Sequence, residues 1–476
     1  MIQRPQAVPE PLWRQTVKRC ALRPNGMATS LMNAMRAKCD LAARLPMDEA
    51  FEVFCALSEL DAAHALRRRP LRDLGAVLEA EAAEPVIVLN PGGEPRVNRA
   101  PEIHGPGHVP ELRNTGRRIL AGWLEDATVF ARSALVARGE ELLRDAQHDE
   151  LTSLPEELAF DPVVFRRTGA AEVAFIEDTG PGRCLHLPRA LSLLGINADS
   201  FGHWMLEQLP RFLATRALLG AATPPLLVDA DIPAQHAEAL RFFGGEDGPE
   251  IIEVPRGLRV RVDRLFCVLD WAYAPHLITT DEGLDVSKVH AVVPWVAGVY
   301  AQAGARADAR IAELGVAVAP QIRAQRRVFW ARKPARHRSI ANWEALRDRL
   351  DELGYVTVFP EEMGFAAQVA TLRAADRIVV QNGSGSLGLP LARPGTRVLY
   401  LSHPEMSRFA WQSEAFACLG FDLRVLSGPF TERSQPWVDQ SNYEIEMPVA
   451  EAALAWMEAD LPHGRGRAMQ TARPRP

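Results

Sequence analysis

The chain has 476 residues, and its 54 lysine and arginine side chains against 60 aspartate and glutamate side chains give a formal net charge of −6. At about 100–200 residues per domain, this length predicts two or three domains with sizeable cores and excludes a small disulfide-stabilised scaffold. The mildly negative charge argues against nucleic acid as the main partner, because such proteins normally carry a basic surface.

Cysteine spacing and the length of the apolar runs indicate the compartment. The six cysteines lie far apart, with no CxxC pair and no Cys/His spacing that suits zinc, so a reducing cytoplasm is expected. The longest apolar run, near residues 291–301, contains a proline and a glycine and is shorter than the roughly 20 residues that span a bilayer. The first residues have no apolar signal core. We therefore expect a soluble cytoplasmic protein.

Residues 1–84 predict a small helical prefix. Apolar residues between Thr29 and Ala83 recur near the 3.6-residue period of a helix, and a run of arginines begins at Arg67. A solvated helix end is the simpler interpretation of this run. Basic residues also favour anionic surfaces, so peripheral association with the inner face of a membrane is left open.

Residues 85–310 predict an α/β domain with a β-rich entry. Pro and Gly are frequent at its start, and short apolar runs follow between Ile119 and Ala137. From Glu172 onward, strand-like runs alternate with helical ones, which is typical of a parallel sheet covered by helices.

Residues 311–462 predict half of a doubly wound fold. Asn342 is expected to cap a helix that ends at Gly354, since glycine adopts the left-handed conformation without strain. Apolar runs around the helices predict four strands: Val328–Trp330, Tyr355–Phe359, Arg377–Gln381 and Arg397–Leu401. Two α/β halves in one chain predict a cleft, with ligands at the carboxyl ends of the strands. Residues 463–476 are basic and proline-rich, so we expect a disordered tail.

A glycine-rich loop follows the third of these strands. Gly383, Gly385 and Gly388 match a GxGxxG pattern, and Glu405 lies near the distance at which a dinucleotide fold places its ribose-binding acid. The late position of the loop and Pro390 argue against a dinucleotide site. A loop that faces a phosphate or a sugar is favoured, with a plain glycine turn as the alternative.

Two further clusters carry charges suited to chemistry. The first contains Arg332 and Arg338 after a strand, where guanidinium groups can bind phosphate oxygens in pairs and stabilise a leaving diphosphate; a solvated basic loop is the alternative. The second contains His203 and Glu207, which are four positions apart and so share one helix face. Either side chain can act as a base, although a lone histidine on an apolar helix is more often a core residue.

An acidic pair, Asp229 and Asp231, follows a predicted strand. Carboxylates at this spacing can hold a divalent metal on a nucleotide-sugar diphosphate, but short acidic turns are common at strand ends. We expect no metal here.

Taken in order, these segments resemble glycosyltransferase family 61, which includes bacterial capsular-polysaccharide enzymes. The segments that carry the resemblance are His203–Arg211, Trp330–Arg332, Arg338–Asn342, Leu353–Tyr355, Phe365–Gln368, Ala374–Ala375, Asn382–Gly385 and Pro394–Thr396. The similarity is strong from Ala198 to Leu401 and weaker from Leu120.

The resemblance implies a GT-B fold, with two Rossmann-like domains facing across a cleft, and an inverting, metal-independent transfer from a nucleotide sugar. Arg332 and Arg338 match the family's arginines at the donor diphosphate, and His203 matches the histidine of its amino-terminal domain. The family often has His-Gly-Ala where this chain has Asn382, Gly383 and Ser384. Since an asparagine cannot take a proton, an acid/base role at position 382 is not expected.

We therefore expect an inverting glycosyltransferase that uses a nucleotide sugar, most simply a UDP-sugar, without a cofactor. The acceptor is expected to be a hydroxyl of a glycan or lipid-linked glycan in capsular, exopolysaccharide or other surface-glycan synthesis. The donor site would contain Arg332, Arg338, Asn382, Gly383, Ser384 and Glu405. His203 or Glu207 would deprotonate the acceptor. An NAD-dependent oxidoreductase and a non-catalytic glycan-binding or assembly protein of the same fold are the alternatives.

Overall fold

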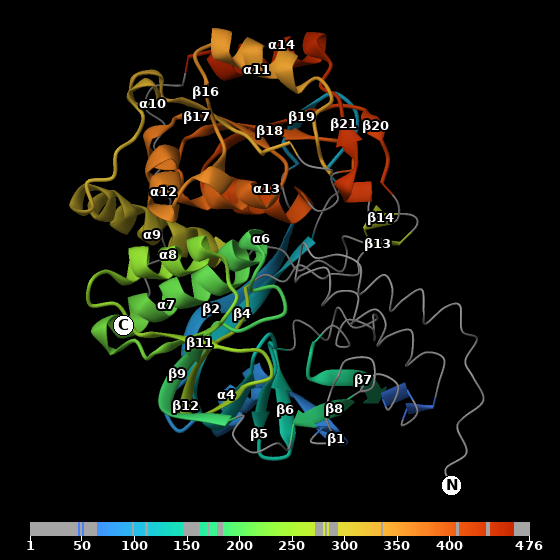
Figure 1. Cartoon of the computed structure of the whole chain (residues 1–476), viewed down its shortest axis with the longest axis vertical. Coiled ribbons are helices and arrows are strands. Elements are labelled where there is room, and N and C mark those ends of the chain that lie inside the picture. Colours follow the sequence, from blue (N-terminus) through green and yellow to red (C-terminus); the bar gives the residue numbers. More distant parts are fainter. Residues whose placement is uncertain are drawn as a thin grey trace.

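The fold is that of a computed structural model, shown in Figure 1. It describes residues 46–47, 50–51, 64–97, 100–109, 113–145, 161–169, 171–178, 184–271, 279–280, 283–284, 294–334, 337–405, 409–434 and 438–460. The predicted tail at 463–476 and most of the predicted helical prefix lie outside these ranges. Among the described helices, none has the length and apolar character needed to cross a bilayer.

The carboxy-terminal half is built on a parallel sheet that has six strands within the described ranges. Its strands, in spatial order, are β16 (Val356–Val358), β15 (Arg327–Trp330), β17 (Arg377–Gln381), β18 (Arg397–Ser402), β19 (Asp422–Ser427) and β3 (Glu102–His104). The four predicted strands of this half are confirmed, with bounds that differ by at most two residues. Continuous apolar runs identified them because strands buried on both faces show no alternation of polar and apolar residues.

Helices cover both faces of this sheet (Figure 1). One face is covered by α11 (Trp343–Glu352) and α14 (Met447–Glu458), and the other by α12 (Phe365–Ala374) and α13 (Phe409–Cys418). Successive side chains of a strand point to opposite faces of the sheet. Buried Phe329 accordingly packs in the core under α11 and α14, and buried Val328 packs in the core on the other face.

The predicted helix from Asn342 to Gly354 is confirmed, but its cap differs from the prediction. Gly354 has φ of +80°, as a left-handed stop requires. Asn342 stands at the N-cap position without bonding the helix, because its side chain pairs with the backbone of Ile445: Oδ1 accepts from the N–H at 3.0 Å and Nδ2 donates to the carbonyl at 2.6 Å. The side chain therefore ties α11 to the segment that leads into α14.

The amino-terminal half contains a mixed sheet, of which eleven strands lie in the described residues. A parallel part is formed by β11 (Ile251–Val254), β10 (Leu226–Asp229), β9 (Cys184–Ser192) and β12 (Arg259–Val268). The sheet continues through β4 (Arg113–Phe130), β5 (Val136–Arg138), β6 (Glu141–Arg144), β1 (His64–Asp73), β8 (Glu172–Asp178) and β7 (Val164–Gly169), with β2 (Ile87–Val97) on β4. The predicted β-rich entry and the later alternation of strands and helices are confirmed.

Helices join the two halves through one continuous core. The chain passes from β9 into α6 (Phe201–His203), the π-helix η2 (Trp204–Gln208) and α7 (Leu209–Leu219), and from β10 into α8 (Ala234–Gly244). These helices and α9 (Pro294–Glu313) lie between the sheets in Figure 1, and their apolar residues belong to the same core as α12.

Smaller described elements are α4 (Leu74–Glu81), α10 (Pro320–Gln325), β13 (Thr279–Thr280), β14 (Gly283–Leu284), β20 (Phe430–Glu432), β21 (Asn442–Tyr443) and the 3₁₀ segments η3 (Gly220–Ala222), η5 (Pro360–Glu362), η6 (Ser384–Leu391) and η7 (Val438–Gln440).

The predicted α/β fold class is confirmed, but two local predictions are wrong. The helical prediction between Thr29 and Ala83 fails at His64–Asp73, which is a strand paired with β8 and β6, and holds at Leu74–Glu81. The segment Glu102–His104 crosses the predicted boundary between the halves, because it pairs with β19 in the carboxy-terminal sheet. The other domain limits stay predictions.

Candidate active site

The strand order places a ligand position between β15 and β17. The connection from β15 leads to β16, its neighbour on one side, and the connection from β16 leads to β17, the neighbour of β15 on the other side. The gap between β15 and β17 is therefore a topological switch point, where the connections run in opposite directions along the sheet. A cavity of about 310 Å³ lies there, lined from the carboxy-terminal half by residues that include Arg332, Arg338 and Ser384. Its other wall comes from the amino-terminal half: Phe201, Pro233, Gln235 and His236. The cavity thus lies between the two halves.

The two predicted arginines both line this cavity and are linked through Gln381 at the end of β17. The backbone N–H of Arg332 donates to Gln381 Oε1 at 3.2 Å, and Gln381 Nε2 donates to the carbonyl of Arg338 at 3.0 Å. Arg338 has a left-handed backbone with φ of +59°, which costs a non-glycine residue about 1 kcal/mol or more. The loop is therefore held by specific contacts in a conformation that presents both arginines.

The glycine-rich loop is fixed against the same cavity. The indole Nε1 of Trp330 donates to the carbonyl of Gly385 at 3.1 Å, and the hydroxyl of Ser386 donates to the carbonyl of Gly383 at 2.7 Å. The loop continues into the 3₁₀ segment η6, with Pro390 inside it, where a dinucleotide-binding loop would begin an α-helix. Gly383 and Ser384 line the cavity, whereas Asn382 is not among its lining residues. Asn382 instead accepts a hydrogen bond from the Tyr400 hydroxyl at 3.0 Å.

His203 and Glu207 form the predicted pair on one helix face. Nδ1 of His203 lies 2.7 Å from Oε1 of Glu207, and the two side chains are 22% and 10% exposed. The pair lies where α6 becomes the π-helix η2, a feature often found at functional sites. The Tyr300 hydroxyl from α9 donates to the carbonyl of Met205 within this turn. Neither member of the pair lines the cavity; Phe201, two residues before His203, does.

Residues 201–399 match the model of the family described as Glycosyltransferase 61. The match supports the assignment of this part of the chain to glycosyltransferase family 61. The predicted resemblance is confirmed, and the family indicates glycosyltransferase activity, which in general requires a sugar donor and a glycan acceptor. The matched range includes the cavity, both arginines, the glycine-rich loop and the His203–Glu207 pair. No curated protein matches the chain.

Glu405 is not among the residues that line this cavity. It follows β18, two strands away from the point where the connections diverge, and forms an isolated bridge with His108. Glu361 is the acidic residue that lines the cavity, in η5 after β16. Spacing along the sequence does not give the spatial order of the strands, so the donor-binding role of Glu405 stays a prediction.

The acidic pair at the end of β10 is bound to arginines. Asp229 is fully buried and accepts from the backbone N–H of Arg132 at 2.6 Å and of Gly195 at 3.3 Å. Burial raises the pKa of Asp229 to about 6. The carboxylate of Asp231 lies 3.3 Å from Arg132 and 3.0 Å from Arg256. Within the described residues, no three His, Cys, Asp or Glu side chains are grouped as metal ligands.

Several cavity residues besides Glu361 were missed in the sequence, among them His236 and Gln368. His236 is fully buried near the start of α8, its Nδ1 donates to the carbonyl of Ala198 at 3.0 Å, and its ring stacks on Trp204. Gln368 is buried on α12 and donates to the carbonyls of Pro360 and Met363 at 2.9 and 3.1 Å, which fixes the segment that carries Glu361. The only available signal was that each helix follows a predicted strand.

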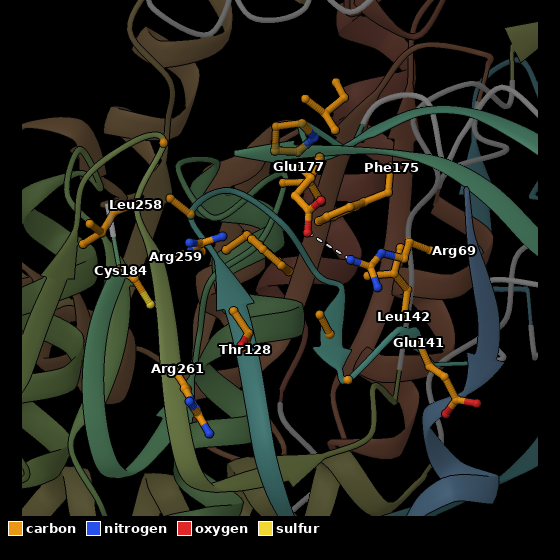
Figure 2. Close-up of a pocket in the computed structure, with 18 residues that line it drawn as sticks. Arg69, Thr128, Glu141, Leu142, Phe175, Glu177, Cys184, Leu258, Arg259 and Arg261 are labelled. Atoms are coloured by element: carbon orange, nitrogen blue, oxygen red, sulfur yellow. Dashed lines mark hydrogen bonds and ion pairs between the residues drawn. The ribbon is translucent and has the colours of Figure 1, made fainter. Parts of the chain in front are cut away.

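A second, larger cavity of about 510 Å³ lies in the amino-terminal sheet (Figure 2). Its walls include the apolar side chains of Leu142, Phe175 and Leu258 and the exposed thiol residue Cys184. Arg69 at its side is paired with Glu177 at 2.9 Å, the contact drawn as a dashed line in Figure 2. Arg259 and Arg261 also line this cavity, and Arg261 is paired with Asp126 at 2.9 Å.

Proposed function

We propose that this chain is an inverting glycosyltransferase of GT-B type that moves a sugar from a nucleotide sugar, most simply a UDP-sugar, to a hydroxyl of a glycan. The observation that carries the proposal is the position of Arg332 and Arg338 in one cavity with Gly383 and Ser384. Two guanidinium groups that line one cavity suit the oxygens of a diphosphate.

In this proposal, the arginines act on the leaving group. Breaking the bond between the sugar and the nucleoside diphosphate develops negative charge on the departing phosphate. Arg332 and Arg338 stabilise that charge through charge-assisted hydrogen bonds, in a preorganised site that needs little rearrangement. No divalent metal is required for this role, and the carboxylate of Asp231 is already paired with Arg132 and Arg256. The enzyme is therefore expected to work without a metal or another cofactor.

The nucleoside is expected to lie toward β16. In doubly wound folds, an acidic residue at the end of the strand beside the phosphate-binding strand accepts hydrogen bonds from ribose hydroxyls. Glu361 follows β16, which pairs directly with β15, and it lines the cavity. We therefore assign to Glu361 the ribose contact that the sequence spacing had suggested for Glu405.

The acceptor hydroxyl is expected to approach from the amino-terminal half. Inversion requires attack on the sugar from the side opposite the leaving diphosphate, so the base and the cations must come from different sides. Glu207 holds Nδ1 of His203 at 2.7 Å, which orients the imidazole and stabilises its protonated form, while Nε2 takes the proton of the hydroxyl. The acceptor would be a glycan or a lipid-linked glycan in surface-polysaccharide synthesis, at a cytoplasmic or peripheral membrane location.

The test is a calorimetric titration with UDP, GDP, CMP and NAD, each with magnesium and with EDTA. The wild type is compared with Arg332→Ala and with Arg347→Ala, an exposed arginine of α11 that contacts Asp348. One nucleotide should bind equally with and without metal, more weakly to Arg332→Ala and unchanged to Arg347→Ala. Binding of NAD alone would favour the oxidoreductase, and well-folded protein that binds none of the four would contradict the proposal.

A further inference from the structure

We propose that His236 is a specificity-determining residue whose Nε2 accepts a hydrogen bond from a hydroxyl group of the bound donor sugar. The inference rests on the proposed function, and it concerns the wall of the cavity opposite the arginines. It assigns to the amino-terminal half the recognition of the sugar that is transferred.

The orientation of the His236 ring is fixed by two contacts. Nδ1 must carry a hydrogen, because it lies 3.0 Å from the carbonyl oxygen of Ala198, which can only accept. The ring stacks on Trp204 with a centroid distance of 4.7 Å and an angle of 8° between the planes. The imidazole therefore cannot turn without losing both the hydrogen bond and the stacking.

The second ring nitrogen, Nε2, is the atom of His236 that could bind a ligand. Nε2 of His236 is buried and has no hydrogen-bond partner among the described residues. A buried polar atom without a partner typically costs about 1–3 kcal/mol, so such atoms usually have a reason. Since His236 lines the cavity, a ligand there is the simplest partner.

The protonation state decides which ligand group fits. Burial lowers the pKa of His236 to about 4, so the ring is neutral near pH 7. With the only hydrogen on Nδ1, Nε2 can accept but cannot donate. Phosphate and carboxylate oxygens are acceptors and would be repelled. A hydroxyl group can donate, and sugars carry several.

The surroundings place the sugar on this wall. Arg332 and Arg338 hold the phosphates on the opposite wall in the proposed function, and the transferred sugar is the next group of the donor. Phe201 lies beside His236, with ring centroids 5.9 Å apart, and also lines the cavity. An aromatic ring suits the apolar C–H face of a sugar, while the neighbouring imidazole accepts from one of its hydroxyl groups.

Two variants separate this role from a structural one. His236→Asn keeps an N–H near the position of Nδ1 and removes the acceptor at Nε2. His236→Gln places a carbonyl oxygen near Nε2 and loses the bond to Ala198. The probes are UDP and GDP, and the sugars UDP-glucose, UDP-galactose, UDP-N-acetylglucosamine, UDP-xylose and GDP-mannose, titrated by calorimetry. Thermal melts of both variants are recorded beside the wild type.

We expect His236→Asn to bind the free nucleoside diphosphate as the wild type does and the preferred nucleotide sugar about tenfold more weakly. His236→Gln should melt at a lower temperature and retain most of the extra affinity for the sugar. The inference is overturned if His236→Asn binds the nucleotide sugar with wild-type affinity, or if its affinity for the free nucleoside diphosphate falls by the same factor. It is also overturned if both variants lose the same share of their affinity for the nucleotide sugar. A wild type that binds no nucleotide overturns the proposed function and this inference with it, whereas Arg332→Ala tests the proposed function alone.

Discussion

Nδ1 of His203 lies 2.7 Å from Oε1 of Glu207, four positions further along the chain, at the point where α6 widens into the π-helix η2. The side chain of Glu207 is only 10% exposed, so water screens this contact poorly. A histidine oriented by a carboxylate is the arrangement that general-base catalysis uses in many enzymes. The pair is therefore the first place to test the proposed chemistry.

Glu207→Gln should lower kcat by roughly 10²-fold, within the range of general-base contributions, because glutamine keeps the shape but cannot stabilise an imidazolium. His203→Ala should lose at least as much. Initial rates are compared with thermal melts of the same samples, since a buried structural pair would lower the melting temperature instead. Full activity at an unchanged melting temperature in His203→Ala would exclude this residue as the base.

Arg332→Ala should lower kcat by about 10²-fold or more, judged by losses at other sites that stabilise a developing charge. Arg332→Lys should recover only part of the loss, because an ammonium group keeps the charge but not the fork that binds two oxygens. Rates at saturating donor, with Arg347→Ala as the exposed control, measure the effect. Equal turnover in Arg332→Ala and the control would remove Arg332 from the leaving-group site.

Gly202→Ala tests the close contact between α6 and the glycine-rich loop. A Cβ at Gly202 would lie 2.9 Å from Cδ1 of Leu387 and 3.5 Å from Cβ of Ser384. Leu387 is only 6% exposed, so its side chain has little room to move away. We expect the free energy of unfolding to fall by about 1–3 kcal/mol and the activity to fall as the loop shifts.

Gly298→Ala is the matched control for this substitution. Gly298 lies in α9, and a Cβ there would meet no atom within 4 Å. Alanine inside a helix is favoured over glycine by roughly 0.5–1 kcal/mol, so this variant should be slightly more stable. Urea denaturation of both proteins gives the comparison, and similar midpoints for the two variants would show that the contact at Gly202 is not tight.

The sequence predicted the carboxy-terminal half well because its signals are local. The run Arg377–Gln381 is a buried strand bounded by turn residues, and it was predicted with its observed limits. By contrast, Glu102–His104 is a short strand whose pairing depends on Arg424, which lies 322 residues further along the chain. Neither composition nor periodicity carries such information, since pairing over this distance is set by the folded arrangement of the whole chain.

The same distinction explains the candidate site. Arg332 and Gly383 follow strands that meet at the carboxyl edge of one parallel sheet, so their proximity was predictable from the fold class. Glu405 was selected by spacing alone, and the strand order puts it away from the cavity. His236 could not be predicted as a cavity residue, because the cavity forms only where the carboxy-terminal half packs against the helix that carries it.

The buried carboxyl of Asp229 should make stability depend on pH in an unusual direction. Burial raises the pKa of Asp229 from 3.8 to about 6, so the folded protein holds this proton more tightly than the unfolded chain does. The resulting stabilisation is complete below pH about 4 and is lost as the pH rises through about 6. Asp229→Asn abolishes the titration. Asp229→Asn should therefore lower the free energy of unfolding by about 2 kcal/mol more at pH about 4.5 than at pH about 7.5.

Urea denaturation of the wild type and Asp229→Asn at both pH values measures this difference, with Gly298→Ala as a control that changes no titrating group. Other carboxyl groups also titrate in this range, but they are common to all three proteins and cancel in the comparison. A loss that is equal at both pH values, or larger at the higher one, would mean that the bonds from the N–H groups of Arg132 and Gly195 outweigh the burial of the charge. In that case Asp229 would be a permanently ionised anchor for the loop that leads into α6.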